Sequence, residues 1–311
     1  MMSGSVGFLI FFLTYAIVYG ILAIGLNIQW GFTGLVNFGV AGFFAVGAYV
    51  AAFITGAPSQ YHLGGFGLPF PVGLLVATVV SGIFALILGF PVIRLREDYL
   101  AIVTIGFAEI VRLVIVTERH ITKGPYGMGV IKPYNDMVPA SFYGLFYLGI
   151  AIAVLLVLYL AMERAVRSPW GRALRTIRED ERVAVAFGKN VNSFKLQVLV
   201  LGSMIFGLAG AVFGHFFNFI TPDHFLPMET FLVWVMVMAG GSGNNLGVLF
   251  GALAIRGVWE GMMFLSDVLP TGIQIGAVRL AVIGLLLVLV VMVKPEGVLG
   301  EKKTASDILG E

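Results

Sequence analysis

Apolar stretches, most of them close to the roughly 20 residues that a helix needs to cross a bilayer, follow one another along almost the whole sequence. Hydrophobic residues make up 59% of the 311 residues and charged residues only 12%, far from the composition of soluble domains. We predict an all-α polytopic membrane protein with about eight to ten transmembrane helices. The candidate spans are 6–27, 33–55, 70–93, 99–117, 142–162, 196–221, 229–241, 246–267 and 275–293.

The polar stretches between these candidates are too short for a soluble domain, so residues 1–311 are predicted to form one transmembrane domain. The candidate 229–241 is short and runs into the segment GGSGNN (Gly240–Asn245). Residues 229–267 therefore fit either two spans or a broken helix pair that includes a re-entrant piece.

One long polar stretch, from Glu163 to Lys195, contains eight of the nineteen Lys and Arg residues of the chain. Apolar residues recur in it at helical spacing, which predicts a short helix with one apolar face and otherwise charged sides. These residues are Trp170, Leu174, Ile177, Ala184 and Phe187. Gly188 follows as a C-terminal stop. A helix of this kind needs a partner for its apolar face.

The distribution of basic residues predicts the orientation of the chain, because Lys and Arg concentrate in cytoplasmic loops. If nine spans alternate and residues 163–195 are cytoplasmic, thirteen of the nineteen Lys and Arg residues fall on the cytoplasmic side. These include Lys302 and Lys303 in the C-terminal tail. The loop 118–141 then lies outside. We predict an N-terminus outside the cell and a C-terminus in the cytoplasm.

Two pairs of opposite charges lie inside predicted spans. Glu109 and Arg112 are three residues apart, and Arg256 and Glu260 are four apart, so each pair shares one helix face. One interpretation is a self-neutralising ion pair that lowers the cost of inserting the span. The other is a substrate or proton site, because charges at membrane depth usually face a protein interior or a water-filled cavity.

Glycine-rich segments interrupt the apolar pattern at 31–49 and again at 239–252. One interpretation is a pair of broken elements near a translocation path. Their polar contributors are Asn37, Asn244 and Asn245. The alternative is close helix packing through glycines at four-residue spacing. Those glycines are Gly243, Gly247 and Gly251.

Residues for catalysis are missing from the sequence. It has no cysteine, which excludes disulfides, zinc thiolates and thiol nucleophiles. A Ser/His/Asp set, a plausible carboxylate dyad, a cluster of metal ligands and the P-loop motif GxxxxGK[ST] are also missing. We predict a protein that is not an enzyme, holds no cofactor or metal, and has membrane lipid but no nucleic acid as a partner. If ATP drives it, another chain binds the ATP.

Six separated motifs occur in a fixed order over nearly the whole chain. They are GLNIQWGFTGLVNFGVAGFFAVGAYVA (25–51), RLREDYLAIVTIGFAEIVRL (94–113), SPWGRALRTIREDERVAVAFGKNV (168–191), GLAGAVFGHFFNFITPDHF (207–225), MAGGSGNNLGVLFGA (238–252) and KPEGVLG (294–300). Together they resemble the LivM-type permease subunit of branched-chain amino-acid ABC transporters. Hydrophobic composition alone does not produce six motifs in register. The resemblance implies an ABC importer permease architecture in the inner membrane.

The resemblance also implies partners: a homologous second permease subunit, two cytoplasmic ABC ATPase subunits and an extracytoplasmic substrate-binding protein. The charged helix of 163–195 would be the cytoplasmic coupling element that docks in a groove of an ATPase subunit. Its coupling residues would be Leu174, Ile177, Arg178, Asp180, Glu181, Ala184, Phe187 and Gly188. Gly188 matches the glycine of the family's loop motif, with a purely structural cap as the alternative. Arg182 and Val183 depart from that motif, which has Glu and Ala there.

We predict that the chain forms half of the pore of an ATP-driven importer for branched-chain or other hydrophobic amino acids. Candidates for the translocation path are Asn37, Glu109, Asn244 and Asn245. The outer loops 118–141 and 222–228 are candidate contacts of the binding protein. Two alternatives stay open: an ABC permease for urea or short amides, and an ion-coupled secondary transporter with Glu109 or Glu260 as the coupling carboxylate.

Overall fold

The computed structural model describes residues 4–58, 64–130, 134, 138–139, 141–262, 275–294 and 296–300. Among these residues, six helices are long and apolar enough to cross a membrane. They are α1 (Gly4–Leu26), α3 (Phe70–Val92), α4 (Glu97–Thr117), α6 (Tyr143–Arg167), α9 (Val191–Phe217) and α12 (Ile275–Val293). Three shorter helices fill the remaining apolar stretches: α2 (Val40–Thr55), α10 (Pro227–Gly240) and α11 (Asn245–Gly261).

The connections contain only short elements within the described part of the chain. The helices are α5 (Arg119–Thr122), α7 (Pro169–Glu179) and α8 (Glu181–Ala186), with the π-helical turn η1 (Asn27–Gly31) and the 3-10 turns η2 (Gly124–Tyr126) and η3 (Pro222–Phe225). The strands β1 (Met128–Gly129) and β2 (Phe219–Ile220) pair with each other. The prediction of an all-α polytopic membrane protein is confirmed.

Two predicted span boundaries need correction. The first span continues through η1 to Gly31, and the second is helical only from Val40 rather than from residue 33. The chain turns between them because Gly34 has a φ of +75°, a conformation that glycine adopts without a steric penalty. Residues 263–267 of the candidate 246–267 lie outside the described residues.

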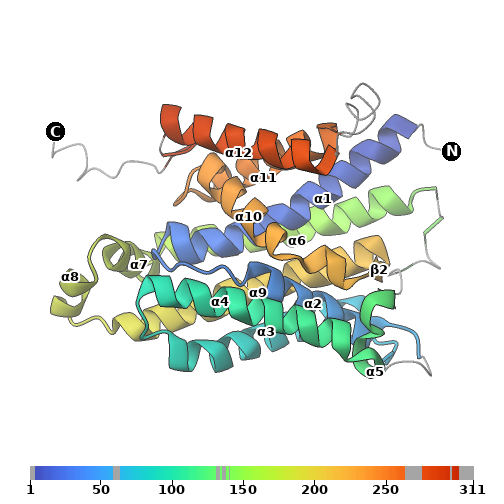
Figure 1. Cartoon of the computed structure of the whole chain (residues 1–311), viewed down its shortest axis with the longest axis horizontal. Coiled ribbons are helices and arrows are strands. Elements are labelled where there is room, and N and C mark those ends of the chain that lie inside the picture. The colour runs from blue at the N-terminus through green and yellow to red at the C-terminus, as the bar shows by residue number, and fades with distance from the viewer. Residues whose placement is uncertain are drawn as a thin grey trace.

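The long helices run roughly along one direction (Figure 1). α7 and α8 lie at one end of the molecule, which we call the charged end, and α5 and β2 lie at the opposite end with the start of α1 (Figure 1). The turn between α3 and α4 also lies at the charged end, where Arg94 and Arg96 line one open hollow together with Glu181 and Lys195. The basic residues of two separate connections therefore gather at the same end.

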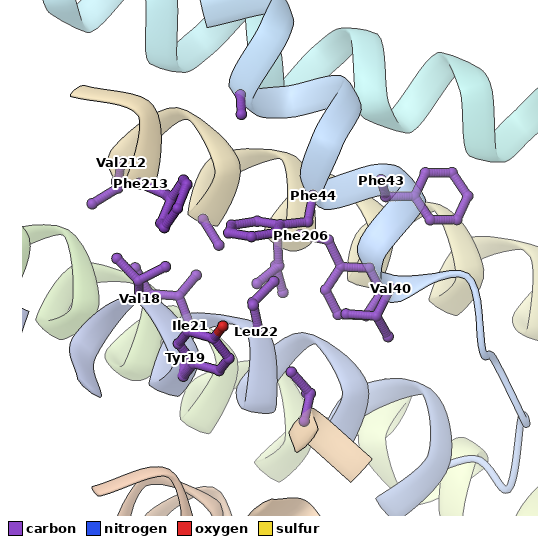
Figure 2. Packing of buried hydrophobic residues seen from close by; sticks show 14 of the residues in the cluster. Val18, Tyr19, Ile21, Leu22, Val40, Phe43, Phe44, Phe206, Val212 and Phe213 are labelled. Atoms are coloured by element: carbon purple, nitrogen blue, oxygen red, sulfur yellow. The ribbon is translucent and has the colours of Figure 1, made fainter. Parts of the chain in front are cut away.

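The core forms where α1, α2 and α9 meet. Figure 2 shows side chains from these three helices converging. The labelled residues are Val18, Tyr19, Ile21, Leu22, Val40, Phe43, Phe44, Phe206, Val212 and Phe213. Aromatic rings pack against one another in this region, with the centroids of Phe44 and Phe213 5.1 Å apart. Such pairs add to the stabilisation that burial gives.

Glycines allow the backbones around α9 to touch. A Cβ at Gly47 of α2 would lie 2.1 Å from the carbonyl oxygen of Gly207, and one at Gly210 would lie 2.1 Å from that of Phe44. A Cβ at Gly207 would lie 2.1 Å from Ser81 Oγ of α3. Small residues let membrane helices approach closely where no hydrophobic force drives them together. α9 therefore packs in close backbone contact with α2 and lies against α3 through Gly207.

α10 and α11 are joined by the turn 241–244 and pack against each other in antiparallel directions. A Cβ at Gly251 would lie 2.1 Å from the carbonyl oxygen of Met236, and one at Gly240 would lie 2.2 Å from that of Gly247. The close-packing interpretation is thus confirmed for Gly247 and Gly251. It is wrong for Gly243, which lies in the turn before α11 with a φ of +78°. Gly241, in the turn between the two helices, has a φ of +113°, a conformation that glycine adopts without a steric penalty.

We predict that Gly210→Ala lowers the free energy of unfolding by about 2–3 kcal/mol, because the added methyl group meets backbone atoms of α2 that cannot rotate away. The matched control is Gly149→Ala in α6, where a Cβ has no neighbour within 4 Å. Helix propensity makes that change neutral or stabilising by up to about 1 kcal/mol. Thermal unfolding of the purified variants in detergent measures the difference. Equal melting temperatures for Gly210→Ala and Gly149→Ala would contradict the close packing of Gly210 against α2.

Candidate functional site

The interruption between α1 and α2, residues 27–39, carries three fully buried amide side chains. Asn37 Nδ2 donates to Gln29 Oε1 at 2.8 Å, and Gln29 Nε2 donates to the carbonyl oxygen of Leu199 in α9 at 3.0 Å. Asn37 Oδ1 accepts the N–H of Gly39 at 2.7 Å. At membrane depth an unsatisfied polar group costs several kcal/mol. Gln29 and Asn37 therefore satisfy each other and two backbone groups, the Leu199 carbonyl and the Gly39 N–H.

Asn27 connects this interruption to the second one, at 241–244. Its Nδ2 donates to Asn245 Oδ1 at 2.9 Å, and its Oδ1 accepts the N–H of Gly243 at 2.8 Å. A Cβ at Gly31 would lie 2.6 Å from the Gly243 nitrogen, so the two backbones come close only because Gly31 has no side chain. The two glycine-interrupted segments thus lie in contact.

The network continues into the first residues of the charged stretch. Asn245 Nδ2 donates to Glu163 Oε2 at 3.1 Å, and Glu163 Oε1 accepts from Arg167 Nε at 2.9 Å. Asn244 caps α11 by accepting the N–H of Leu246 at 3.1 Å, and its Nδ2 donates to the carbonyl oxygen of Leu299 at 2.8 Å. The second interruption is therefore bound both to α6 and to residues after α12.

These contacts give Asn37, Asn244 and Asn245 a structural role. The nitrogen and oxygen of each amide have partners within the chain. The three side chains hold the interruptions together, and their place on a translocation path stays a prediction. The sequence analysis did not identify Asn27, Gln29 and Glu163 as parts of this network. The amides of Asn27 and Gln29, at the end of the first apolar stretch, were a usable signal.

The charged stretch contains two short helices where the sequence predicted one. Asp180 separates α7 from α8 with an extended backbone, and its Oδ1 accepts the N–H groups of Arg182 at 2.7 Å and Val183 at 3.3 Å. Asp residues favour this N-cap position for that reason. Asp180 thus has a structural role as a helix cap, and its expected rim contact stays a prediction. The spacing of apolar residues could not reveal the break.

The apolar face predicted for docking is largely occupied by the chain itself. Leu174 is buried against Ile28, Phe32, Val166 and Val198. Ile177 and Ala184 are buried with Val191. The prediction of a free face is therefore wrong for Leu174, Ile177 and Ala184, because α6, α9 and the first interruption already cover them.

α8 presents a different apolar group to the surroundings. Phe187 is 75% exposed, Val185 59% and Val183 44%. We call these three residues the α8 patch. Gly188 ends the helix with a φ of +73°, and a Cβ there would meet no atom within 4 Å. That geometry supports the structural-cap interpretation of Gly188.

Side chains of the charged stretch also reach the first interruption and α9. The Arg178 guanidinium donates to the carbonyl oxygen of Gly31, and that of Arg175 lies 5.5 Å from the ring centroid of Phe32. Glu181 of α8 forms an ion pair with Lys195 of α9. α7 and α8 are therefore fixed to the membrane-embedded part at several points.

The two intramembrane ion pairs form as predicted but in different surroundings. Arg256 and Glu260 are 2.8 Å apart, with side chains only 4% and 11% exposed. The guanidinium of Arg256 lies 3.5 Å from the ring centroid of Tyr15, and Tyr19 of the same helix donates to Glu229. These contacts favour the self-neutralising interpretation for Arg256 and Glu260. Glu229 was not recognised from sequence.

The second pair, on α4, lies at the surface of this chain. Arg112 Nε donates to Glu109 Oε2 at 2.9 Å and to Oε1 at 3.2 Å. The side chain of Glu109 is 37% exposed and that of Arg112 is 23% exposed. This pair is therefore open to contacts from outside the chain.

At the opposite end, β1 of the predicted outer loop 118–141 pairs with β2, which lies just before the predicted outer loop 222–228 and corrects the end of the candidate span 196–221. Met128 pairs with Ile220, and Val130 donates to the carbonyl oxygen of Asn218 at 2.8 Å. The neighbouring turn η3 depends on His224, whose Nδ1 accepts the N–H of Thr221 at 3.2 Å. Burial lowers the pKa of His224, and the nearby Asp223 partly opposes that shift. The part of 118–141 after Val130 is described only at 134, 138–139 and 141.

This arrangement of long apolar helices, two interrupted segments and the attached helices α7 and α8 is that of a polytopic membrane protein. A family model described as "Branched-chain amino acid transport system / permease component" matches residues 8–291. LivM of Escherichia coli, a high-affinity branched-chain amino acid transport system permease protein, is 32% identical over 309 residues, covering 92% of this chain and 68% of the relative. No solved structure matches the chain.

Two further relatives cover both chains almost fully. A probable LivM of Methanocaldococcus jannaschii is 29% identical, over 92% of this chain and 91% of its own length. LivH of Salmonella typhimurium is 25% identical, over 92% of each chain. This chain belongs to the family of permease components of branched-chain amino acid transport systems. Members are transport subunits rather than enzymes, and separate ATPase subunits of the same transporters hydrolyse ATP.

We predict that Asn27→Ala lowers the free energy of unfolding by about 2–4 kcal/mol, because the Gly243 N–H and Asn245 Oδ1 each lose a buried partner worth about 1–3 kcal/mol. Asn192→Ala is the control, since Asn192 is exposed at the start of α9. Thermal unfolding in detergent compares both variants with the wild type. A loss of stability no larger than that of Asn192→Ala would contradict the role of Asn27 in joining the two interruptions.

We predict that the segment 219–225 loses protection as the pH falls below about 6.5, the ordinary pKa of histidine. The folded state holds His224 neutral with Nδ1 as an acceptor, so at lower pH the unfolded segment binds a proton that the folded one does not. The stabilisation is complete above that pH and is lost as the pH falls through the lowered pKa of His224.

Hydrogen exchange at pH 7.5 and 5, corrected for intrinsic rates, measures this protection. His224→Gln should abolish the pH dependence, whereas replacing the exposed His120 by Gln should leave it intact. The same pH dependence in His224→Gln would rule out His224 as its source.

Proposed function

We propose that this chain is one of two homologous permease subunits of an ATP-driven importer for branched-chain and other hydrophobic amino acids. The family match over residues 8–291 carries the proposal, and the cargo is the one in the names of the relatives. The other partners would be two cytoplasmic ATPases and an extracytoplasmic binding protein. The chain would form one transmembrane domain of the inner membrane, with its N-terminus outside, its C-terminus inside, and 163–195 as its coupling loop.

The α8 patch is the surface that we assign to ATPase docking. Val183, Val185 and Phe187 project from a short helix whose other exposed residues are charged or small. Partner helices of this type place apolar anchors in a groove and surround them with charged rim contacts. Arg182 and Lys189 would contribute to that rim. Basic residues at this end favour a cytoplasmic location; Lys302 and Lys303 lie outside the described residues.

The proposed mechanism moves α7 and α8 as a lever. Leu174 packs on Phe32, Arg178 binds the backbone of Gly31, and Asn245 binds Glu163. A displacement that an ATPase imposes at the α8 patch would therefore reach both interrupted segments. Rigid-body motion of packed elements between two arrangements is the usual means of alternating access.

At the opposite end, the two joined outer loops form the surface that we assign to the binding protein. Two exposed aromatic side chains belong to this surface: Phe219 lies in β2, paired with Gly129, and Tyr126 lies just before β1. Exposed aromatic residues are frequent anchors in protein interfaces. An ion-coupled carrier is less well supported, since both Glu109 and Glu260 are already paired with arginine.

Affinity purification from the native membrane, followed by mass spectrometry, tests the assembly. The wild type should bring down a second permease and an ATPase pair. Phe187→Asp should reduce recovery of the ATPase about tenfold or more, because a charge in the anchor position removes a hot-spot contact. It should leave the second permease bound. Tyr126→Asp, at the opposite end, is the matched control and should retain the ATPase.

Two outcomes would count against the proposal. A wild-type chain that purifies without any ATPase contradicts the importer. Full ATPase recovery with Phe187→Asp contradicts only the assignment of the α8 patch to ATPase docking and leaves the importer function standing. Leu174→Asp is unsuitable for this purpose, because Leu174 is buried within this chain and the change would disturb folding.

A further inference from the structure

The exposed ion pair of α4 lies well inside the membrane-spanning helix. Glu109 is 12 residues after Glu97, the first residue of α4, which places it about 18 Å along the helix axis. Helical side chains tilt toward the N-terminus, and Arg112 accordingly reaches back to Glu109. The guanidinium therefore points toward the interior of the span and away from the nearer end at Thr117.

Such a pair is costly against lipid. Charges at membrane depth almost always face a protein interior or a water-filled cavity. The Arg256–Glu260 pair meets that rule, since it is buried under the rings of Tyr15 and Tyr19. Among the described residues no ring covers Arg112 in this way, and Glu109 stays 37% exposed. The face of α4 that carries the pair is therefore turned toward a path or a neighbouring subunit.

The same face of α4 carries open space and aliphatic side chains beside the ion pair. Gly106, one turn before Glu109, leaves open space, because a Cβ there would meet nothing within 4 Å. Ile102 and Ile105 are exposed on the same side of α4, since positions three, four and seven residues apart share a helix face. Asp223 of η3 is close enough to interact electrostatically with Arg112. Paired charges thus lie beside free space and aliphatic side chains.

We propose that Glu109 and Arg112 form a subsite for the zwitterionic head of an amino acid in transit. Glu109 accepts hydrogen bonds from the α-ammonium group and Arg112 donates to the α-carboxylate, while the aliphatic side chain lies along Ile102 and Ile105. Both contacts are charge-assisted hydrogen bonds. The proposal rests on the importer function and selects amino acids over neutral urea or amides, which lack the two charges that the pair complements.

Cysteine labelling tests whether this face lines the path. The natural chain has no cysteine, so Gly106→Cys introduces its one thiol into open space. In the assembled transporter in vesicles, a membrane-impermeant, charged methanethiosulfonate should modify this thiol. Leucine with its binding protein should slow that modification several-fold, and urea should not. Ile87→Cys is the control, because Ile87 is exposed on α3, a helix without charged residues, and should stay unmodified.

A Gly106→Cys thiol that the reagent does not reach would overturn the proposal, because the face would then lie against lipid or the second permease. Labelling that leucine leaves unchanged would also overturn it. If urea slows the modification as much as leucine does, the proposed selection of amino acids over urea is contradicted.

A second experiment removes the two charges together, so that no unpaired charge remains. Glu109→Gln combined with Arg112→Gln should lower the leucine taken up per ATP hydrolysed about tenfold or more, the loss expected when two charge-assisted contacts disappear. Arg256→Gln combined with Glu260→Gln is the matched control and should lower the yield of folded protein instead. Unchanged uptake per ATP in the α4 variant would overturn the proposal. If the wild type shows no ATP-driven uptake, the importer function itself fails.

Discussion

The amide of Asn27 is the contact on which both interruptions of the membrane-spanning helices depend. No water is present in the hydrocarbon region to satisfy open backbone groups. Asn27 accepts from Gly243 and donates to Asn245, so one side chain at the start of η1 binds both the second interruption and the helix that follows it. Asn245 in turn donates to Glu163, where the charged stretch begins. A change in any of these parts therefore affects the other two.

The helices α7 and α8 have one face that packs on this chain and another that is exposed. Their inner face is fixed, with Leu174 on Phe32 and Glu181 paired with Lys195. On their outer face, Val185 and Phe187 remain 59% and 75% exposed. In the function that we propose, this division is what a lever requires: a rigid attachment on one side and a docking surface on the other.

Local composition predicted the helices, because the length of an apolar stretch largely decides whether it forms a membrane helix. It did not predict which partner covers a face. The spacing of Leu174 and Ile177 shows that one side of α7 is buried, but not that Phe32 already covers it. Similarly, Glu109–Arg112 and Arg256–Glu260 look alike in sequence. Tertiary packing against Tyr15 buries the second pair and leaves the first exposed.

The importer proposal is tested most directly by transport in proteoliposomes. This chain, purified together with its associated permease and ATPases, would be reconstituted, and uptake of labelled leucine measured with and without ATP and the binding protein. We predict uptake that requires both. Uptake driven by a proton or sodium gradient in the absence of ATP would contradict the proposal and make the chain an ion-coupled carrier.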